Sequence, residues 1–171
     1  MLNLPNMITI ARILLVPVFL AIFWSPGPNR VAMGMGVLAL AGLTDILDGY
    51  LARKYDMITL LGKILDPVAD KLMIIAAMTS LFMIDRLPLW LVVLVLVKDV
   101  ILVTGSFFVV VKEKHAVSAS VYGKAATIWV YTALFSGAFG INGSTVIAVI
   151  AAVVSVLALT NYINSFVRRR A

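Results

Sequence analysis

The sequence predicts an all-α integral membrane protein with six transmembrane helices and a polar cavity at its cytoplasmic side. Of its 171 residues, 63% are hydrophobic and 13% are charged, whereas soluble domains are usually about 45–50% apolar. The apolar stretches are continuous rather than alternating, which favours helices over the strands of a membrane β-barrel. Cysteine is absent, which excludes a disulfide scaffold and a thiolate metal site. We expect a single membrane domain over residues 1–171.

Each predicted helix is an apolar stretch close to the roughly 20 residues that are needed to cross a bilayer. The first stretch contains Arg12 and is followed by no A-x-A cleavage site, so we interpret it as a retained helix rather than a signal peptide. The breakers "SPGPNR", "DRLP" and "GINGS" follow the first, third and fifth stretches. The predicted helices cover approximately residues 8–24, 31–51, 59–83, 89–111, 121–139 and 145–167.

Lysine and arginine lie mainly on one side of this arrangement, and they set its orientation. The segments that follow the second, fourth and sixth stretches are basic, whereas the opposite side carries Arg30 and Arg86. The positive-inside rule therefore puts both termini in the cytoplasm, and we expect a multi-pass protein of the bacterial cytoplasmic membrane. The net charge of +6 reflects this topology, so we expect no nucleic-acid partner. The basic side carries Arg53, Lys54, Lys63, Lys112, Lys114, Lys124, Arg168, Arg169 and Arg170.

Four aspartates interrupt the apolar sequence at the cytoplasmic ends of the second and third stretches. Asp45, Asp48 and Gly49 lie at spacings of three and four, which places them on one face of a helix. Asp66 and Asp70 are four residues apart and form a second stripe on the next helix. Because a short connection makes these helices antiparallel neighbours, we expect the four carboxylates to converge on one cavity.

Converging carboxylates need a compensating charge, because one aspartate at the centre of a membrane helix costs about 2.5–3.5 kcal/mol. Carboxylate oxygens without His or Cys favour hard cations such as Mg²⁺, Mn²⁺ or Ca²⁺. Two divalent ions would match four carboxylates in charge, and two-metal sites commonly activate phosphate chemistry. Gly49, Ala52 and Gly62 leave room for a ligand beside the acids, or they allow close helix packing. Arg53 is a phosphate contact or a positive-inside anchor.

A cation- or proton-coupled transporter is the alternative from a different functional class, because buried acids also form ion paths. A transporter would be expected to carry its acids near the membrane midplane, with broken helices in repeated halves. Here the acids cluster at one membrane face beside Arg53, and no internal repeat is visible. The placement of the acids therefore favours an enzyme.

The acidic motif resembles the signature of the CDP-alcohol phosphatidyltransferases at every fixed position and in both gaps. It reads Asp45-x2-Asp48-Gly49-x2-Ala52-Arg53-x8-Gly62-x3-Asp66-x3-Asp70. The segment "NLPNMITIARILLVP" also resembles the N-terminal part of that family, and "LDPVADKLM" is similar to its phosphatidylglycerophosphate synthase and cardiolipin synthase branches. The resemblance implies transfer of a phosphatidyl group from CDP-diacylglycerol to an alcohol, with release of CMP, in an active-site cavity at the cytoplasmic side.

The resemblance also implies the roles of the motif residues. Two divalent cations, Mg²⁺ or Mn²⁺, are held by the four aspartates, and Asp70 is in addition the candidate general base. The metal ligands are then Asp45, Asp48, Asp66 and Asp70. The nucleotide of the donor is bound by Asp45, Gly49, Ala52, Arg53 and Gly62.

Three further residues are candidates for the same nucleotide pocket. Asn6, Thr9 and Arg12 are spaced by three on one helix face near the cytoplasmic surface. They either line the pocket or form a polar helix start with one anchoring arginine, and the resemblance favours the pocket. The resemblance and the large lipid-facing surface of six helices also predict a homodimer in the bilayer.

The predicted acceptor is glycerol 3-phosphate, which gives phosphatidylglycerophosphate. This acceptor carries close to two negative charges and needs cations that are not committed to the donor, so we expect Lys98 and Lys124 to bind it, with Lys114 behind them. The alternatives are an ion pair of Lys98 with Asp99 or with another helix, and an interfacial anchor for Lys124.

Two departures from the glycerophosphate branch favour other acceptors. That branch typically has basic residues where this chain has Ser106 and Ala126, and "KDVILV" is closer to the cardiolipin synthase branch. Phosphatidylglycerol, giving cardiolipin, is therefore the second choice, and inositol phosphate and serine are further alternatives.

Overall fold

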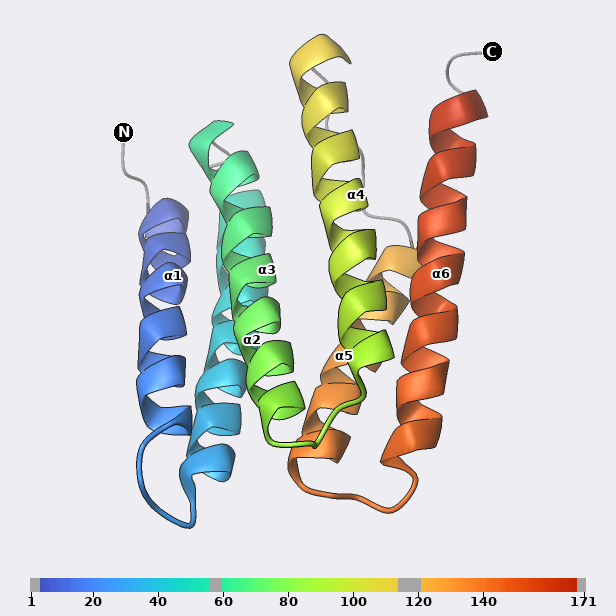
Figure 1. The fold of residues 1–171 in the computed structure, drawn as a ribbon. Helices are drawn as coiled ribbons and strands as arrows, with labels where there is room; N and C mark the ends of the chain where they lie inside the picture. The colour runs from blue at the N-terminus through green and yellow to red at the C-terminus, as the bar shows by residue number, and fades with distance from the viewer. Residues whose placement is uncertain (1–3, 56–59, 114–120, 169–171) are drawn as a thin grey trace. The chain divides into compact units, whose positions relative to one another are not determined.

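The described part of the chain is entirely helical apart from its turns. The computed structural model describes residues 4–55, 60–113 and 121–168, and these residues form six α-helices (Figure 1). The helical class is therefore confirmed, and each predicted stretch coincides with one helix to within a few residues. The helices are α1 (Leu4–Phe23), α2 (Arg30–Lys54), α3 (Leu60–Met83), α4 (Leu89–Glu113), α5 (Val121–Ala138) and α6 (Ser144–Arg168).

Two of the described helices are long and apolar enough to cross a membrane. They cover Arg30–Leu51, with a mean hydropathy of 1.6, and Ser144–Asn164, with a mean hydropathy of 2.4. In each helix, 28% of the 18-residue apolar stretch is buried, which is less than expected for the core helix of a soluble protein. Met7–Phe23 is a shorter apolar helix. These helices indicate a membrane protein, whereas six spans remain a prediction.

The helices end where the sequence supplies residues that cannot continue them. After α1, Gly27 adopts a φ of +145° between two prolines, and the chain reverses toward α2. Before α4, Asp85 turns with a φ of 57°, and Pro88 precedes the first helical residue. Between α5 and α6, Gly140 and Gly143 have φ values of 61° and 88°, which glycine adopts without the steric cost that a Cβ brings. The breakers read from the sequence therefore define the turns.

The chain divides into two compact units, residues 1–83 and 84–171. In the first unit, α1 packs against both α2 and α3, and these two helices also contact each other (Figure 1). Phe19 and Phe23 of α1 are fully buried with ring centroids 5.4 Å apart. Met35 and Leu38 of α2 are also fully buried. This apolar core fixes α1 beside the helix that carries the first two aspartates.

In the second unit, α6 packs against α4 and α5. The face that α6 buries consists of small side chains, which let helices approach closely without a hydrophobic driving force in lipid. These residues are Ala148, Ala151, Ala152, Ser155 and Ala158. The buried residues of α5 are also mostly small, whereas α4 contributes Leu91 and Val95.

We expect Gly137→Ala to destabilise the second unit. A Cβ at Gly137 would lie 2.7 Å from the backbone oxygen of Arg86 and 3.1 Å from Leu87, and such overpacking costs about 1–3 kcal/mol. Thermal unfolding in detergent, followed by tryptophan fluorescence, measures the loss.

Gly36→Ala is the matched control, because a Cβ at this helical position meets no atom within 4 Å. Removing a helical glycine there is expected to raise stability by about 0.5–1 kcal/mol. Equal effects of the two substitutions would contradict the packing of Gly137 against residues 86–87.

Candidate functional site

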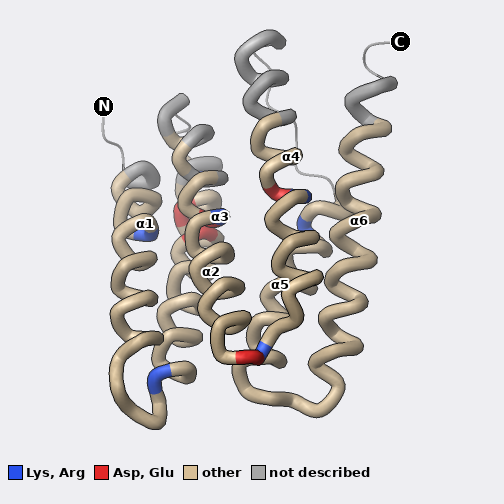
Figure 2. Tube along the Cα trace, in the orientation of Figure 1, with Lys and Arg blue, Asp and Glu red and all other residues tan. Residues whose placement is uncertain are grey.

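A buried arginine joins the first two aspartates of the motif in the first unit. The Arg12 side chain on α1 is 1% exposed, and its Nη1 donates to Asp45 Oδ1 at 2.6 Å. Its Nη2 donates to Asp48 Oδ2. In Figure 2, the blue part of α1 lies at about the height of the red parts of the neighbouring helices α2 and α3. One guanidinium therefore bridges two carboxylates on the neighbouring helix.

The spacing of the residues explains this contact. Asp45 and Asp48 lie one turn apart on α2, and Thr9 and Arg12 lie one turn apart on α1, so each pair shares a helix face. The short turn after Phe23 makes α1 and α2 antiparallel neighbours, which brings the two faces together. The Thr9 Oγ1 also donates to Asp48 Oδ2 at 3.4 Å. Two side chains of α1 therefore hold Asp48.

Burial differs between the two carboxylates. The Asp48 side chain is 4% exposed, whereas that of Asp45 is 43% exposed. An uncompensated charge at the position of Asp48 would be strongly unfavourable, and the contact with the guanidinium stabilises its burial. One guanidinium against two carboxylates leaves a net charge of −1 with the acids ionised.

The third helix adds Asp70, whose side chain is 22% exposed and lies 3.2 Å from the Nζ of Lys71. Gly62 is buried at the start of the same helix, and Gly49 is half-buried on α2. The side chains of several other predicted site residues lie outside those that the structure describes, and Lys114 lies outside the described residues altogether. These side chains belong to Asn6, Ala52, Arg53 and Asp66. The convergence of all four carboxylates therefore remains a prediction.

Within residues 4–55, 60–113 and 121–168, no group of three or more acidic, histidine or cysteine side chains is placed to hold a metal ion. The pair formed by Asp45 and Asp48 nevertheless has the donor chemistry of a hard divalent cation, because it offers only carboxylate oxygens. Arg12 engages one oxygen of each carboxylate. The residues that the structure describes thus fit part of a Mg²⁺ or Mn²⁺ site.

The second unit contains a buried ion pair of its own. The Lys98 Nζ lies 2.7 Å from Asp99 Oδ1, and both side chains are at most 7% exposed. The ion pair that the sequence offered as an alternative for Lys98 is therefore present. Lys124 on α5 is exposed, and Ala126, where the glycerophosphate branch is basic, is buried.

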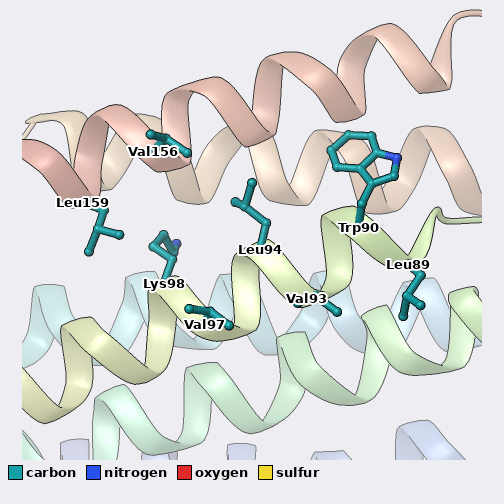
Figure 3. Close-up of a pocket in the computed structure, with 8 residues that line it drawn as sticks. All are labelled: Leu89, Trp90, Val93, Leu94, Val97, Lys98, Val156 and Leu159. Carbon is teal, nitrogen blue, oxygen red and sulfur yellow. The ribbon is translucent and has the colours of Figure 1, made fainter.

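Lys98 also contributes to an apolar cavity of about 740 Å³ between α4 and α6. In Figure 3, Lys98, Leu94 and Trp90 extend from α4 toward the side on which α6 presents Val156. The full lining consists of Leu89, Trp90, Val93, Leu94, Val97, Lys98, Val156 and Leu159. With one polar residue in its wall, this cavity suits an apolar group rather than a polar reaction.

Sequence reasoning grouped Thr9 with Arg12 but missed their contacts with Asp48 and Asp45. A signal for the contact was present, because an arginine inside an apolar helix needs an acidic partner. The stripe formed by Asp45 and Asp48 has the same spacing of three as Thr9 and Arg12.

A family model described as CDP-alcohol phosphatidyltransferase matches residues 2–159. The CDP-diacylglycerol--glycerol-3-phosphate 3-phosphatidyltransferase of Bacillus subtilis is 37% identical over 139 residues, which cover 74% of this chain and 72% of the relative. The protein of the same name from Rickettsia bellii is 36% identical over 148 residues, 85% of this chain and 80% of the relative. The cardiolipin synthase (CMP-forming) of Streptomyces coelicolor is 37% identical over 132 residues, 74% of this chain and 60% of the relative.

The difference in burial predicts different costs for removing the two acids. Asp48→Ala would leave Arg12 buried without its more enclosed partner, and breaking a buried pair costs about 3–5 kcal/mol. Asp45→Ala should cost less, because Asp45 is 43% exposed and Arg12 keeps its contact with the buried Asp48. Unfolding of both variants in detergent, followed by circular dichroism, measures the difference. A loss as large for Asp45→Ala as for Asp48→Ala would contradict this assignment.

Proposed function

The chain belongs to the CDP-alcohol phosphatidyltransferase family, and we propose that it transfers the phosphatidyl group of CDP-diacylglycerol to glycerol 3-phosphate. The products are phosphatidylglycerophosphate and CMP. The acidic cluster of Asp45 and Asp48 beside Arg12 is the observation that carries the proposal, because it supplies an anionic site for the cations that accompany a diphosphate. The names of the relatives from Bacillus subtilis and Rickettsia bellii support the choice of acceptor.

The reaction replaces the phosphoanhydride bond of the donor with a phosphodiester bond to the acceptor. The acceptor hydroxyl oxygen attacks the phosphorus that carries the diacylglycerol, and the bond from this phosphorus to the CMP oxygen breaks. Asp70 takes the hydroxyl proton as general base, a role that suits a carboxylate with 22% of its side chain exposed. Divalent cations, when bound, neutralise the diphosphate and the charge that develops on CMP.

The proposal gives the remaining motif residues binding roles. Asp45, Asp48, Asp66 and Asp70 hold two divalent cations, Mg²⁺ or Mn²⁺. The donor nucleotide is held by Asn6, Gly49, Ala52, Arg53 and Gly62, and Arg53 contacts its phosphate. Thr9 and Arg12 form the α1 side of the same site, where they contact the acids.

We propose that the six helices all cross the bacterial cytoplasmic membrane, with both termini in the cytoplasm, and that the protein is a homodimer. The many exposed apolar side chains support a lipid environment, since water-soluble monomers rarely expose large apolar patches. Examples are Leu14 on α1, Ile46 on α2, Val100 on α4 and Val121 on α5. Cross-linking in mild detergent over a dilution series tests the dimer, and a monomer throughout would contradict it.

Cardiolipin synthesis is the second candidate function, because specific observations favour it. Lys98, a predicted acceptor ligand, is already paired with Asp99, and Ala126 stands where the glycerophosphate branch is basic. The Streptomyces coelicolor relative is a cardiolipin synthase. Phosphatidylglycerol carries one phosphodiester charge and enters from the bilayer, so it needs fewer cations than glycerol 3-phosphate.

One assay tests the acceptor and the metal together. Purified protein with CDP-diacylglycerol and Mn²⁺ should release CMP with glycerol 3-phosphate, and excess EDTA should abolish the release. Asp70→Asn should lower kcat by about 10²- to 10⁴-fold, the usual contribution of a general base, with less effect on the KM for CDP-diacylglycerol. Release with phosphatidylglycerol but not with glycerol 3-phosphate would select the cardiolipin alternative. Full activity in EDTA would exclude the metal mechanism.

Lys124 provides a test of the acceptor site that is separate from donor binding. A charge-assisted hydrogen bond contributes about 1.5–3 kcal/mol, so Lys124→Ala should raise the KM for glycerol 3-phosphate by roughly 10- to 150-fold. The KM for CDP-diacylglycerol should change little. Arg86→Ala, which removes another exposed cation, is the matched control and should leave both constants unchanged. An unchanged KM for glycerol 3-phosphate in Lys124→Ala would leave Lys124 as an interfacial anchor.

A further inference from the structure

Arg12 is enclosed in a way that distinguishes it from a ligand-binding arginine. Its side chain is 1% exposed, and both terminal nitrogens of the guanidinium donate to carboxylates of α2. The other buried polar side chain on this face of α1, Thr9, donates to the same Asp48 oxygen that Arg12 Nη2 contacts. Both buried polar side chains of α1 among the described residues therefore contact this pair of aspartates.

A phosphate of the donor would have to reach a guanidinium whose side chain is only 1% exposed. The packing around Arg12 would have to open before any of its N–H groups, including that of the buried Nε, could meet a phosphate. The guanidinium fork instead holds one oxygen from each of two acids that lie one turn apart. Such a contact restricts rotation of both carboxylate groups.

We propose that Arg12 is a positioning residue for the divalent-cation site, which it serves by orienting the carboxylates of Asp45 and Asp48. The inference rests on the proposed function, because it takes these aspartates as metal ligands. Partners that orient metal ligands typically contribute about 10- to 100-fold to metal affinity. Thr9 supports the same orientation with one hydrogen bond to Asp48.

The positive charge of Arg12 and its orienting contacts have opposite effects on a bound cation. The charge repels the cation, so a purely electrostatic role predicts tighter metal binding when Arg12 is removed. The orienting contacts favour cation binding, so a positioning role predicts weaker binding when Arg12 is removed. A lysine at this position keeps the charge but cannot present two nitrogens in a planar fork. Arg12→Gln and Arg12→Lys therefore separate the two effects.

Titration of the full-length protein with Mn²⁺, followed by electron paramagnetic resonance without substrate, tests the inference. We expect Arg12→Gln to weaken Mn²⁺ binding by about 10- to 100-fold and Arg12→Lys to weaken it too, although its charge is retained. Arg86→Gln is the control for loss of a cation elsewhere and should bind Mn²⁺ like the wild type. Each titration is run well below the melting temperature of the variant, so that loss of folding does not contribute.

Kinetics of the same variants provide a second readout. A positioning role predicts that Arg12→Gln needs a higher Mn²⁺ concentration for activity, with little change in the KM for CDP-diacylglycerol at saturating Mn²⁺. If Arg12→Gln does not fold, Arg12→Lys and Thr9→Val carry the test, with a smaller loss of Mn²⁺ affinity expected for Thr9→Val.

Several results would overturn the inference. Unchanged Mn²⁺ affinity in the Arg12 and Thr9 variants, with a raised KM for CDP-diacylglycerol, would assign Arg12 to donor binding. Tighter Mn²⁺ binding in Arg12→Gln would assign it a purely electrostatic role. If the wild type itself binds no Mn²⁺ and is active in EDTA, the proposed metal-dependent function fails and the inference fails with it. The wild-type titration therefore distinguishes the two failures.

Discussion

The buried contact of Arg12 with Asp45 and Asp48 is the constraint on which the first unit depends. A charged side chain inside an apolar helix is strongly unfavourable unless it is paired. Because the partners of Arg12 lie 33 and 36 residues away along the chain, satisfying its charge fixes α1 against α2 in one register. The apolar contacts of Phe19 and Phe23 hold the same two helices together at the other end of α1. Two independent sets of contacts therefore determine where the acidic motif lies.

The Lys98–Asp99 pair in the second unit follows the same electrostatic rule with a different structural consequence. Its two members are adjacent in the sequence and both belong to α4, so the pair neutralises charge locally without joining two helices. Packing in that unit depends instead on the small side chains of α6, which include Ala151 and Ser155. An ion pair between distant residues thus organises the first unit, and close backbone approach organises the second.

The helices could be predicted from the sequence because each is a continuous apolar stretch bounded by Pro, Gly or charged residues. The register between helices could not, since a periodic pattern gives the face of a residue but not the level at which a neighbouring helix meets it. For this reason the contact between Arg12 and Asp48 was missed even though both residues were selected as site candidates. The family could be predicted because its motif consists of residue spacings within and between consecutive helices. The match of the family model over residues 2–159 confirmed that prediction. The enzyme interpretation is thereby preferred to a transporter.

Charge also explains why the family follows more directly from the sequence than the acceptor. Under the proposed mechanism, a donor diphosphate requires several acids that hold cations, and this requirement sets the spacings of the motif. An acceptor phosphate needs cations alone, which can come from any nearby helix or loop, so it leaves no comparable spacing. Lys98 illustrates the difficulty: it was selected for its charge, but its pairing with Asp99 gives the two residues no net charge. Lys124 is exposed, and it is therefore a better candidate than Lys98 for recognising a dianionic acceptor.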